Sequence, residues 1–101
     1  MKKKIIAKDK DHLKTLIEQE MKQHGNHCDL NYIDVSSIDD MSHLFEKSQF
    51  IGNISQWDVS NVVDMRSMFY KSSFNKNISN WDVSKAERIN NIFEQSKLDI
   101  D

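Results

Sequence analysis

The chain has 101 residues, of which 38% are hydrophobic and 30% charged, a balance typical of one small globular domain rather than a disordered segment. A formal net charge of −2 argues against a nucleic-acid-binding protein held by phosphate contacts. The single cysteine, Cys28, excludes an internal disulfide framework and favours a reducing compartment.

Charge is unevenly distributed along the chain. Residues 1–28 carry a net charge of +3, whereas residues 29–101 carry a net charge of −5 with histidine neutral. The partner expected for the acidic part is therefore a protein with a basic surface, with no nucleic acid involved.

The N-terminal residues begin like an export signal but do not complete one. The apolar run at residues 5–7 is far shorter than the roughly 7–15 residues of a signal peptide. No stretch is long and apolar enough to span a membrane. The sequence as written predicts a cytoplasmic protein, and prior removal of a signal peptide is the alternative that would make it surface-exposed.

A short strand or extended arm is expected over residues 2–8, followed by a helix over residues 10–24. One helix face carries the apolar residues Leu13, Leu16, Ile17 and Met21. Asp9 or Asp11 can cap the first turn, and Gly25 lies where a left-handed residue ends a helix. We expect this helix to cover the hydrophobic end of the part that follows.

The turn after this helix holds the one cluster of metal-ligand residue types, His24, His27, Cys28 and Asp29. No second pair of ligands follows at the spacing of a closed zinc site, so a polar turn is the favoured interpretation. We therefore expect no metal and no other cofactor.

From Leu30 onward the sequence repeats every 24 residues without a gap, in blocks 30–53, 54–77 and 78–101. Eight apolar columns fall in register, among them Ile33/Trp57/Trp81, Val35/Val59/Val83, Met41/Met65/Ile89 and Phe45/Phe69/Phe93. A period in the twenties is typical of stacked-repeat proteins.

Each repeat has the pattern of a short strand followed by a short helix. In the middle copy, Ile54, Trp57 and Val59 have strand-like spacing, whereas Val62, Met65, Met68 and Phe69 have helical spacing. The predicted fold is thus α/β: a short right-handed leucine-rich-repeat-like solenoid of three 24-residue coils with an N-terminal capping helix. Residues 1–29 form the arm and cap, and residues 30–101 the solenoid, within a single compact domain.

The third repeat differs from the second around its apolar columns. Glu87, Arg88 and Asn91 stand where the second repeat has Val63, Asp64 and Ser67. Such polar replacements are expected where a terminal repeat faces water, so the chain is interpreted as complete. The alternative is a fragment of a longer array, and a homodimer through one end of the solenoid also fits.

The motif Asn-Ile-Ser-x-Trp-Asp-Val-Ser-Asn-Val-x-x-Met-x-x-Met-Phe, nearly whole in residues 53–69, is similar to the repeat of the BspA-like bacterial surface-protein family. Residues 77–93 keep its first half, and residues 30–45 are a more diverged copy. The resemblance implies a leucine-rich-repeat-like solenoid used for protein or surface recognition. Members of that family are often exported adhesins or lipoproteins.

One outward-facing position is the same in all three repeats: Asp34, Asp58 and Asp82. Carboxylates stacked at roughly 4.7–4.9 Å repel one another, so they need compensation. Hydrogen bonds from the next coil, a cationic partner protein and a bound cation such as calcium are the three alternatives. The predicted partner-binding residues on this strand face are Tyr32, Asp34, Gln56, Asp58, Asn80 and Asp82.

The sequence predicts no enzyme, because no phosphate-binding glycine-rich loop, nucleophile–base pair or carboxylate-lined cleft is recognisable. The predicted function is a non-enzymatic protein–protein interaction module, such as a small stand-alone inhibitor or adaptor, acting through the acidic strand face. A fragment of an exported surface adhesin or lipoprotein is the alternative.

Overall fold

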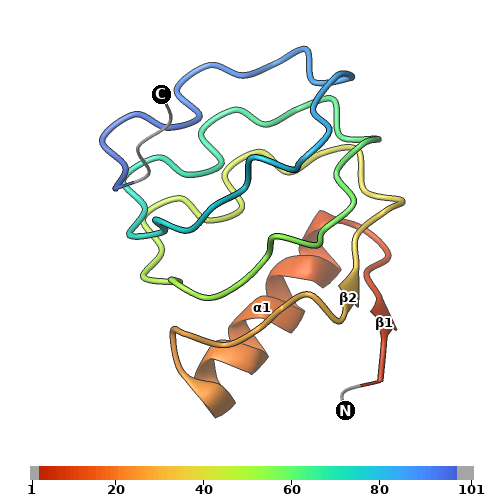
Figure 1. Ribbon diagram of the computed structural model, residues 1–101, viewed down its shortest axis with the longest axis vertical. Helices are drawn as coiled ribbons and strands as arrows, with labels where there is room; N and C mark the ends of the chain where they lie inside the picture. Colours follow the sequence, from red (N-terminus) through yellow and green to blue (C-terminus); the bar gives the residue numbers. More distant parts are fainter. Residues whose placement is uncertain (1–2, 98–101) are drawn as a thin grey trace.

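The computed structural model describes residues 3–97, which contain one helix and one pair of short parallel strands. The elements run β1 (Ile5–Ile6), α1 (Lys10–His24) and β2 (Ile33–Asp34). The molecule measures 33 × 25 × 23 Å, with α1 and the strand pair at one end and the irregular remainder of the chain stacked beyond them (Figure 1).

The helix forms where local signals predict it. The carboxylate of Asp9 accepts a hydrogen bond from the His12 amide at 2.8 Å and so caps the first turn. Gly25, with φ of 83°, donates its amide to the Met21 carbonyl and ends the last turn. Leu13 and Ile17 are buried in the core, which confirms the predicted helix and its apolar face.

The predicted N-terminal arm is present as β1, which pairs with β2. Ile5 lies beside Ile33, and Ile6 beside Asp34, in parallel register. Amides of Ile5 and Ala7 donate to carbonyls on either side of Ile33. The arm therefore pairs with the first repeat, although α1 lies between them in the sequence.

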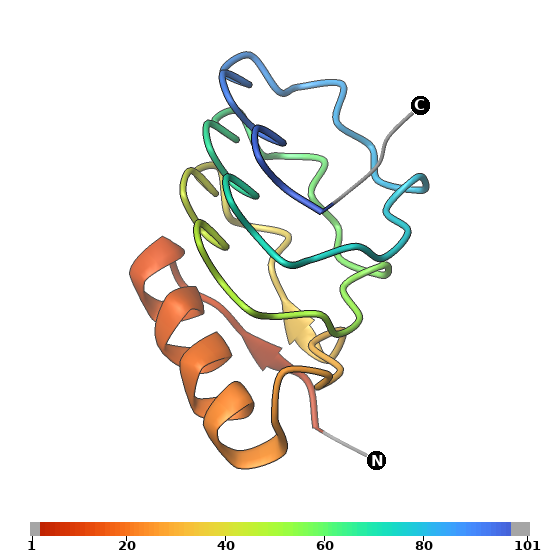
Figure 2. The ribbon, with the colours of Figure 1, turned by 90° about the vertical axis from the view of Figure 1, so that its left-hand side faces the viewer.

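The 24-residue repeats lie one upon another, with α1 at the end of the stack beside the first (Figure 2). We call residues 30–53, 54–77 and 78–97 repeat 1, repeat 2 and repeat 3. Isolated parallel bridges join Asp40 to Asp64 and Asp64 to Arg88, each one period apart. The sequence period is therefore a true spatial period.

Residues 41–48, 65–72 and 89–96 take the same form in each repeat, which we call the turn run. In repeat 2 the amides of Met68, Tyr70 and Ser72 each donate to the carbonyl three residues earlier. Overlapping turns of this kind place residues in the left-handed region. Positive φ angles of 54–61° recur at His43, Lys47, Ser67, Lys71, Asn91 and Gln95.

The other amides of the first two turn runs bond to the next repeat. In repeat 1 the donors are Met41, His43, Phe45 and Lys47, which reach the carbonyls of Asp64, Arg66, Met68 and Tyr70 at 2.8–2.9 Å. In repeat 2 the donors are Met65, Ser67, Phe69 and Lys71, which reach the carbonyls of Arg88, Asn90, Ile92 and Glu94 at 2.7–3.0 Å. Alternate amides thus serve turns within a repeat and contacts between repeats.

The predicted fold class is wrong. The expected leucine-rich-repeat-like α/β solenoid requires a strand and a helix in each of three coils, with a capping helix in addition. Among residues 3–97 the only helix is α1 and the only strands are the two-residue β1 and β2, so the protein is a small globule. The repeats themselves consist of turns and isolated bridges.

The spacing of the repeats explains this difference. The rings of Phe45, Phe69 and Phe93 are stacked with centroids 5.7 and 5.8 Å apart. Packed helices need 8–10 Å between their axes, so helices cannot fit at this spacing. The turn run keeps the apolar residues buried while leaving half of its amides to bond the next repeat.

Candidate functional site

Two surfaces merit attention, and the first is the predicted row of aspartates. Asp34 is half-buried, whereas Asp58 and Asp82 are exposed, one on each successive repeat. Each carboxylate accepts a hydrogen bond from the amide of the serine two residues later, at 2.9–3.0 Å. These turns fix the three carboxylates in equivalent positions.

Serines lower the pKa values of the three aspartates. The hydroxyl of Ser36 donates to Asp34 at 2.7 Å, and that hydrogen bond is the main cause of the lowered pKa of Asp34. Hydrogen bonds from Ser60 and Ser84, with the hydroxyl again foremost, lower the pKa of Asp58 and of Asp82. The donors belong to the same repeat as the carboxylate, not to the next coil as the sequence suggested.

The charges of the row are incompletely balanced. Lys4 acts on Asp34 and Lys85 acts on Asp82, in each case favouring the ionised form. Asp58 lies between the two other aspartates, and both of them oppose its ionisation. The middle of the row therefore has the strongest attraction for an incoming cationic group.

The other residues predicted to bind a partner beside the aspartates, Tyr32, Gln56 and Asn80, differ in their exposure. Tyr32 is half-buried, and its pKa is raised by burial and further by the carboxylate of Glu20 on α1. Gln56 and Asn80 are exposed, and the Gln56 amide donates to the Asn31 side chain at 2.9 Å. Tyr32 is thus engaged with the helix, while Gln56 and Asn80 remain accessible beside the aspartates.

The second surface is an apolar groove at the end of the stack opposite α1. Val35 and Val59 are each 1% exposed, but Val83 in the same column is 47% exposed. Met41 and Met65 are at most 1% exposed, but Ile89 is 55% exposed. The apolar columns that lie inside repeats 1 and 2 reach the surface in repeat 3.

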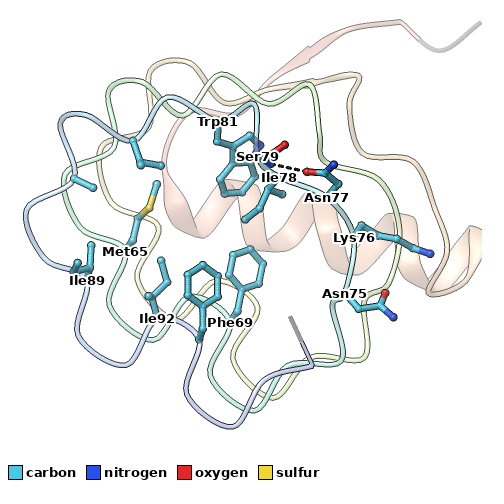
Figure 3. Close-up of a pocket in the computed structure, with 13 residues that line it drawn as sticks. Met65, Phe69, Asn75, Lys76, Asn77, Ile78, Ser79, Trp81, Ile89 and Ile92 are labelled. Atoms are coloured by element: carbon cyan, nitrogen blue, oxygen red, sulfur yellow. Dashed lines mark hydrogen bonds between the residues drawn. The ribbon is translucent and has the colours of Figure 1, made fainter. Parts of the chain in front are cut away.

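This groove has a volume of about 730 Å³ and a predominantly apolar floor. Figure 3 looks onto it, with Trp81, Ile92 and Phe69 around its centre and Asn75 and Lys76 at one side. The Trp81 indole lies flat against Trp57, with centroids 6.4 Å apart, so its other face is turned to the groove. Asp82, the last aspartate of the row, lies in sequence between Trp81 and Val83, which both line the groove.

Sequence reasoning missed this groove. We expected the polar residues Glu87, Arg88 and Asn91 to give repeat 3 a surface suited to water. They are exposed, as are Val83 and Ile89, so the replacements surround the apolar columns without covering them. The signal that could have revealed the groove is the retention of Trp81, Val83 and Ile89 in a repeat that no described residues cover.

The residues considered for metal binding do not form a site. Among residues 3–97, no three His, Cys, Asp or Glu side chains gather as metal ligands would. Cys28 is buried, with its carbonyl oxygen close to Gly52, while His24 and His27 are exposed.

Together, the stacked 24-residue repeats and the open groove define a small repeat protein with an accessible apolar end. The sequence profile of the family described as "Mycoplasma protein of unknown function, DUF285" matches residues 12–99, and the chain belongs to this family. Searches of curated proteins and of solved structures give no match. No helix within residues 3–97 is long and apolar enough to cross a bilayer.

Proposed function

We propose that this protein is a non-enzymatic protein–protein interaction module whose primary contact surface is the groove on repeat 3. The observation that carries the proposal is the exposure of Val83 and Ile89, whose counterparts in the other repeats are buried. Contiguous exposed apolar surface bordered by polar residues is typical of interaction sites. We infer further that the repeats are of the BspA-like type, from the motif in residues 53–69.

The groove can supply the energy of such an interaction. Trp81 and Phe93 each have one ring face against the preceding repeat, so they are rigid apolar anchors that lose little conformational entropy on binding. Burying the exposed parts of Val83 and Ile89 would add a favourable hydrophobic contribution.

The acidic row can supply selectivity. Asp82 lies in sequence between two residues that line the groove, Trp81 and Val83, and Asp58 and Asp34 stand at the same position of the preceding repeats. A partner that carries basic residues next to its apolar segment would gain electrostatic attraction here, which raises the association rate more than the affinity. The acidic row thus contributes to recognition but is not the main contact.

Photo-crosslinking in the native cell tests the proposal. A benzophenone amino acid at position 89 should give a discrete adduct, whereas the same group at the exposed α1 position Gln19 should not. The identified partner is then purified and titrated against variants. We expect Ile89→Lys to weaken binding at least tenfold, and Asp82→Asn to slow association mainly at low salt.

Two results would contradict the proposal. One is an adduct pattern that is the same at positions 89 and 19, which would indicate nonspecific contact. The other is a purified partner that binds Ile89→Lys as tightly as the unaltered protein. Circular dichroism of both variants controls for folding, since residue 89 makes only a small contribution to the core.

A further inference from the structure

The backbone at the groove presents a row of hydrogen-bond donors with a defined spacing. In the first two turn runs, four alternate amides bond to carbonyls of the following repeat. The corresponding amides of repeat 3 have no hydrogen-bond partner among residues 3–97, and they belong to Ile89, Asn91, Phe93 and Gln95. The edge therefore repeats an arrangement that is used twice inside the molecule.

Two acceptors on this edge continue the same pattern. The carbonyls of Asp39 and Val63 each accept two amides from the next repeat, and Glu87 is their counterpart in repeat 3. The carbonyls of Leu30 and Ile54 each accept the indole N–H of a tryptophan in the next repeat, at 2.9 and 3.1 Å. Ile78 occupies the equivalent position and lines the groove (Figure 3), and among residues 3–97 no indole N–H bonds to its carbonyl.

Side chains at this edge also repeat the pattern found between repeats 1 and 2 and between repeats 2 and 3. The groove is lined by the third members of the apolar columns, including Trp81, Val83, Ile89 and Phe93. In the bridge column, Asp40 is followed by Asp64 and then by Arg88. A further copy of repeat 2 would bring an aspartate beside Arg88, giving an opposite-charge pair at this position.

We infer that the groove receives a further 24-residue repeat of the same sequence type, carried by another polypeptide. This inference rests on the proposed function and names the chemistry of the partner. Continuity with the two internal interfaces supports it, because such a repeat satisfies the donors, the acceptors and the apolar columns together. An unrelated apolar segment would fill the groove but leave the amides unpaired, at a cost for each one that is desolvated.

A second copy of this chain does not meet the same requirements. The matching surface of repeat 1 lies against α1, where Lys10 contacts Asp40 and Ser42 at 3.3 and 2.9 Å. If two copies met groove to groove, the turn-run amides of repeat 3 in one copy would face the same amides in the other. Both sets are hydrogen-bond donors, so they could not pair. Self-association is therefore the competing outcome and not the prediction.

The test attaches the occupant at high effective concentration. A copy of residues 54–77 is added directly after Asp101, in step with the 24-residue period. We expect amide exchange at Ile89, Asn91 and Phe93 to slow at least tenfold relative to the unextended protein. A control extension, in which the added counterparts of Trp57, Met68 and Phe69 are aspartate, should leave those amides unprotected.

Each outcome decides the inference. Protection by the repeat and not by the control supports it. Equal exchange in the two extended proteins overturns it, as does concentration-dependent protection of the same amides in the unextended protein, which would assign the groove to a second copy. A specific crosslink at position 89 combined with a failed extension would overturn this inference while leaving the proposed interaction function standing.

Discussion

At the scale of single residues, the aspartates of the repeats serve first to organise turns. Asp34, Asp58 and Asp82 each accept hydrogen bonds from a serine two residues later, and Asp64 binds the Arg66 guanidinium through both oxygens at 3.0 and 2.7 Å. The sequence predicted that the repeated aspartate needs compensation. The sequence could not show which donors provide it. Every repeat has a serine two residues after its aspartate, and the sequence does not show whether a carboxylate faces the serine of its own repeat or that of the next.

These hydrogen bonds make stability depend on pH in a defined direction. The pKa values of Asp34, Asp40, Asp58, Asp64 and Asp82 are all lower in the folded protein than their ordinary value. The unfolded chain therefore binds protons first as the pH falls, so this contribution to stability is complete above about pH 4 and is lost progressively below it.

Thermal melts between pH 7 and pH 2.5 should show this loss as a steep fall in Tm below about pH 4. Ser36→Ala combined with Ser60→Ala should make the fall shallower, because it removes the hydroxyls that lower two of the pKa values. A Tm that rises on acidification through this range would contradict the assignment.

The two tryptophans offer a matched comparison, since each indole donates to a carbonyl of the preceding repeat. Trp57 is buried between repeats, whereas Trp81 is half-buried at the groove. We expect Trp57→Phe to lower the free energy of unfolding by about 1–3 kcal/mol, through the lost hydrogen bond and a small cavity. Trp81→Phe should cost less than about 1 kcal/mol. Urea denaturation of both variants tests the difference, and equal losses would contradict the open groove.

At the scale of elements, prediction from sequence was most accurate for α1. Its N-terminal cap Asp9, its apolar face and its terminating Gly25 are local signals that need no tertiary context. The turn runs were wrongly predicted as helices because Met65, Met68 and Phe69 have a spacing that suits both structures. The turn run differs from a helix in having residues with positive φ, such as Ser67 and Lys71. Serine and lysine rarely adopt that conformation, so the sequence does not indicate it.

The two glycines have different roles at the ends of elements. A Cβ atom on Gly52 would lie 1.8 Å from the Cys28 carbonyl oxygen, so the end of repeat 1 could not approach the segment that precedes this repeat as closely as it does. Gly25 has open space around it but a φ of 83°.

We expect Gly52→Ala to destabilise the protein by about 3 kcal/mol or more, because backbone must move to relieve the overlap. Gly25→Ala should cost less, about 1–3 kcal/mol, because the φ of 83° and ψ of −179° at the end of α1 lie in a region that is almost restricted to glycine. Chemical denaturation of the pair measures both losses. A tolerated alanine at position 52 would show that the contact between Gly52 and Cys28 is looser than described.

At the scale of the whole molecule, the 24-residue period was predictable and the internal geometry of the period was not. Columns such as Phe45/Phe69/Phe93 identify which residues stack, but the 5.7–5.8 Å between their rings excludes the helices that the same columns suggested. The acidic row could be located from sequence alone. The groove could not, because its existence depends on what covers Val83 and Ile89.

Taken as a whole, the molecule has two unlike ends. Helix α1 and the strand pair cover repeat 1, with Lys10 and the apolar face of the helix meeting it directly. At the other end, the groove exposes the same columns without an equivalent cover among the described residues. This asymmetry is the basis for proposing that the interaction surface lies on repeat 3.

The most direct test of this account is amide hydrogen exchange of the purified, dilute protein. We predict slow exchange at the turn-run amides that bond to a following repeat: Met41, His43, Phe45, Lys47, Met65, Ser67, Phe69 and Lys71. Exchange should be faster by at least about a hundredfold at Ile89, Asn91, Phe93 and Gln95, because their only protection would be partial burial. Equal protection of all three turn runs would contradict the open edge and, with it, the proposed binding groove.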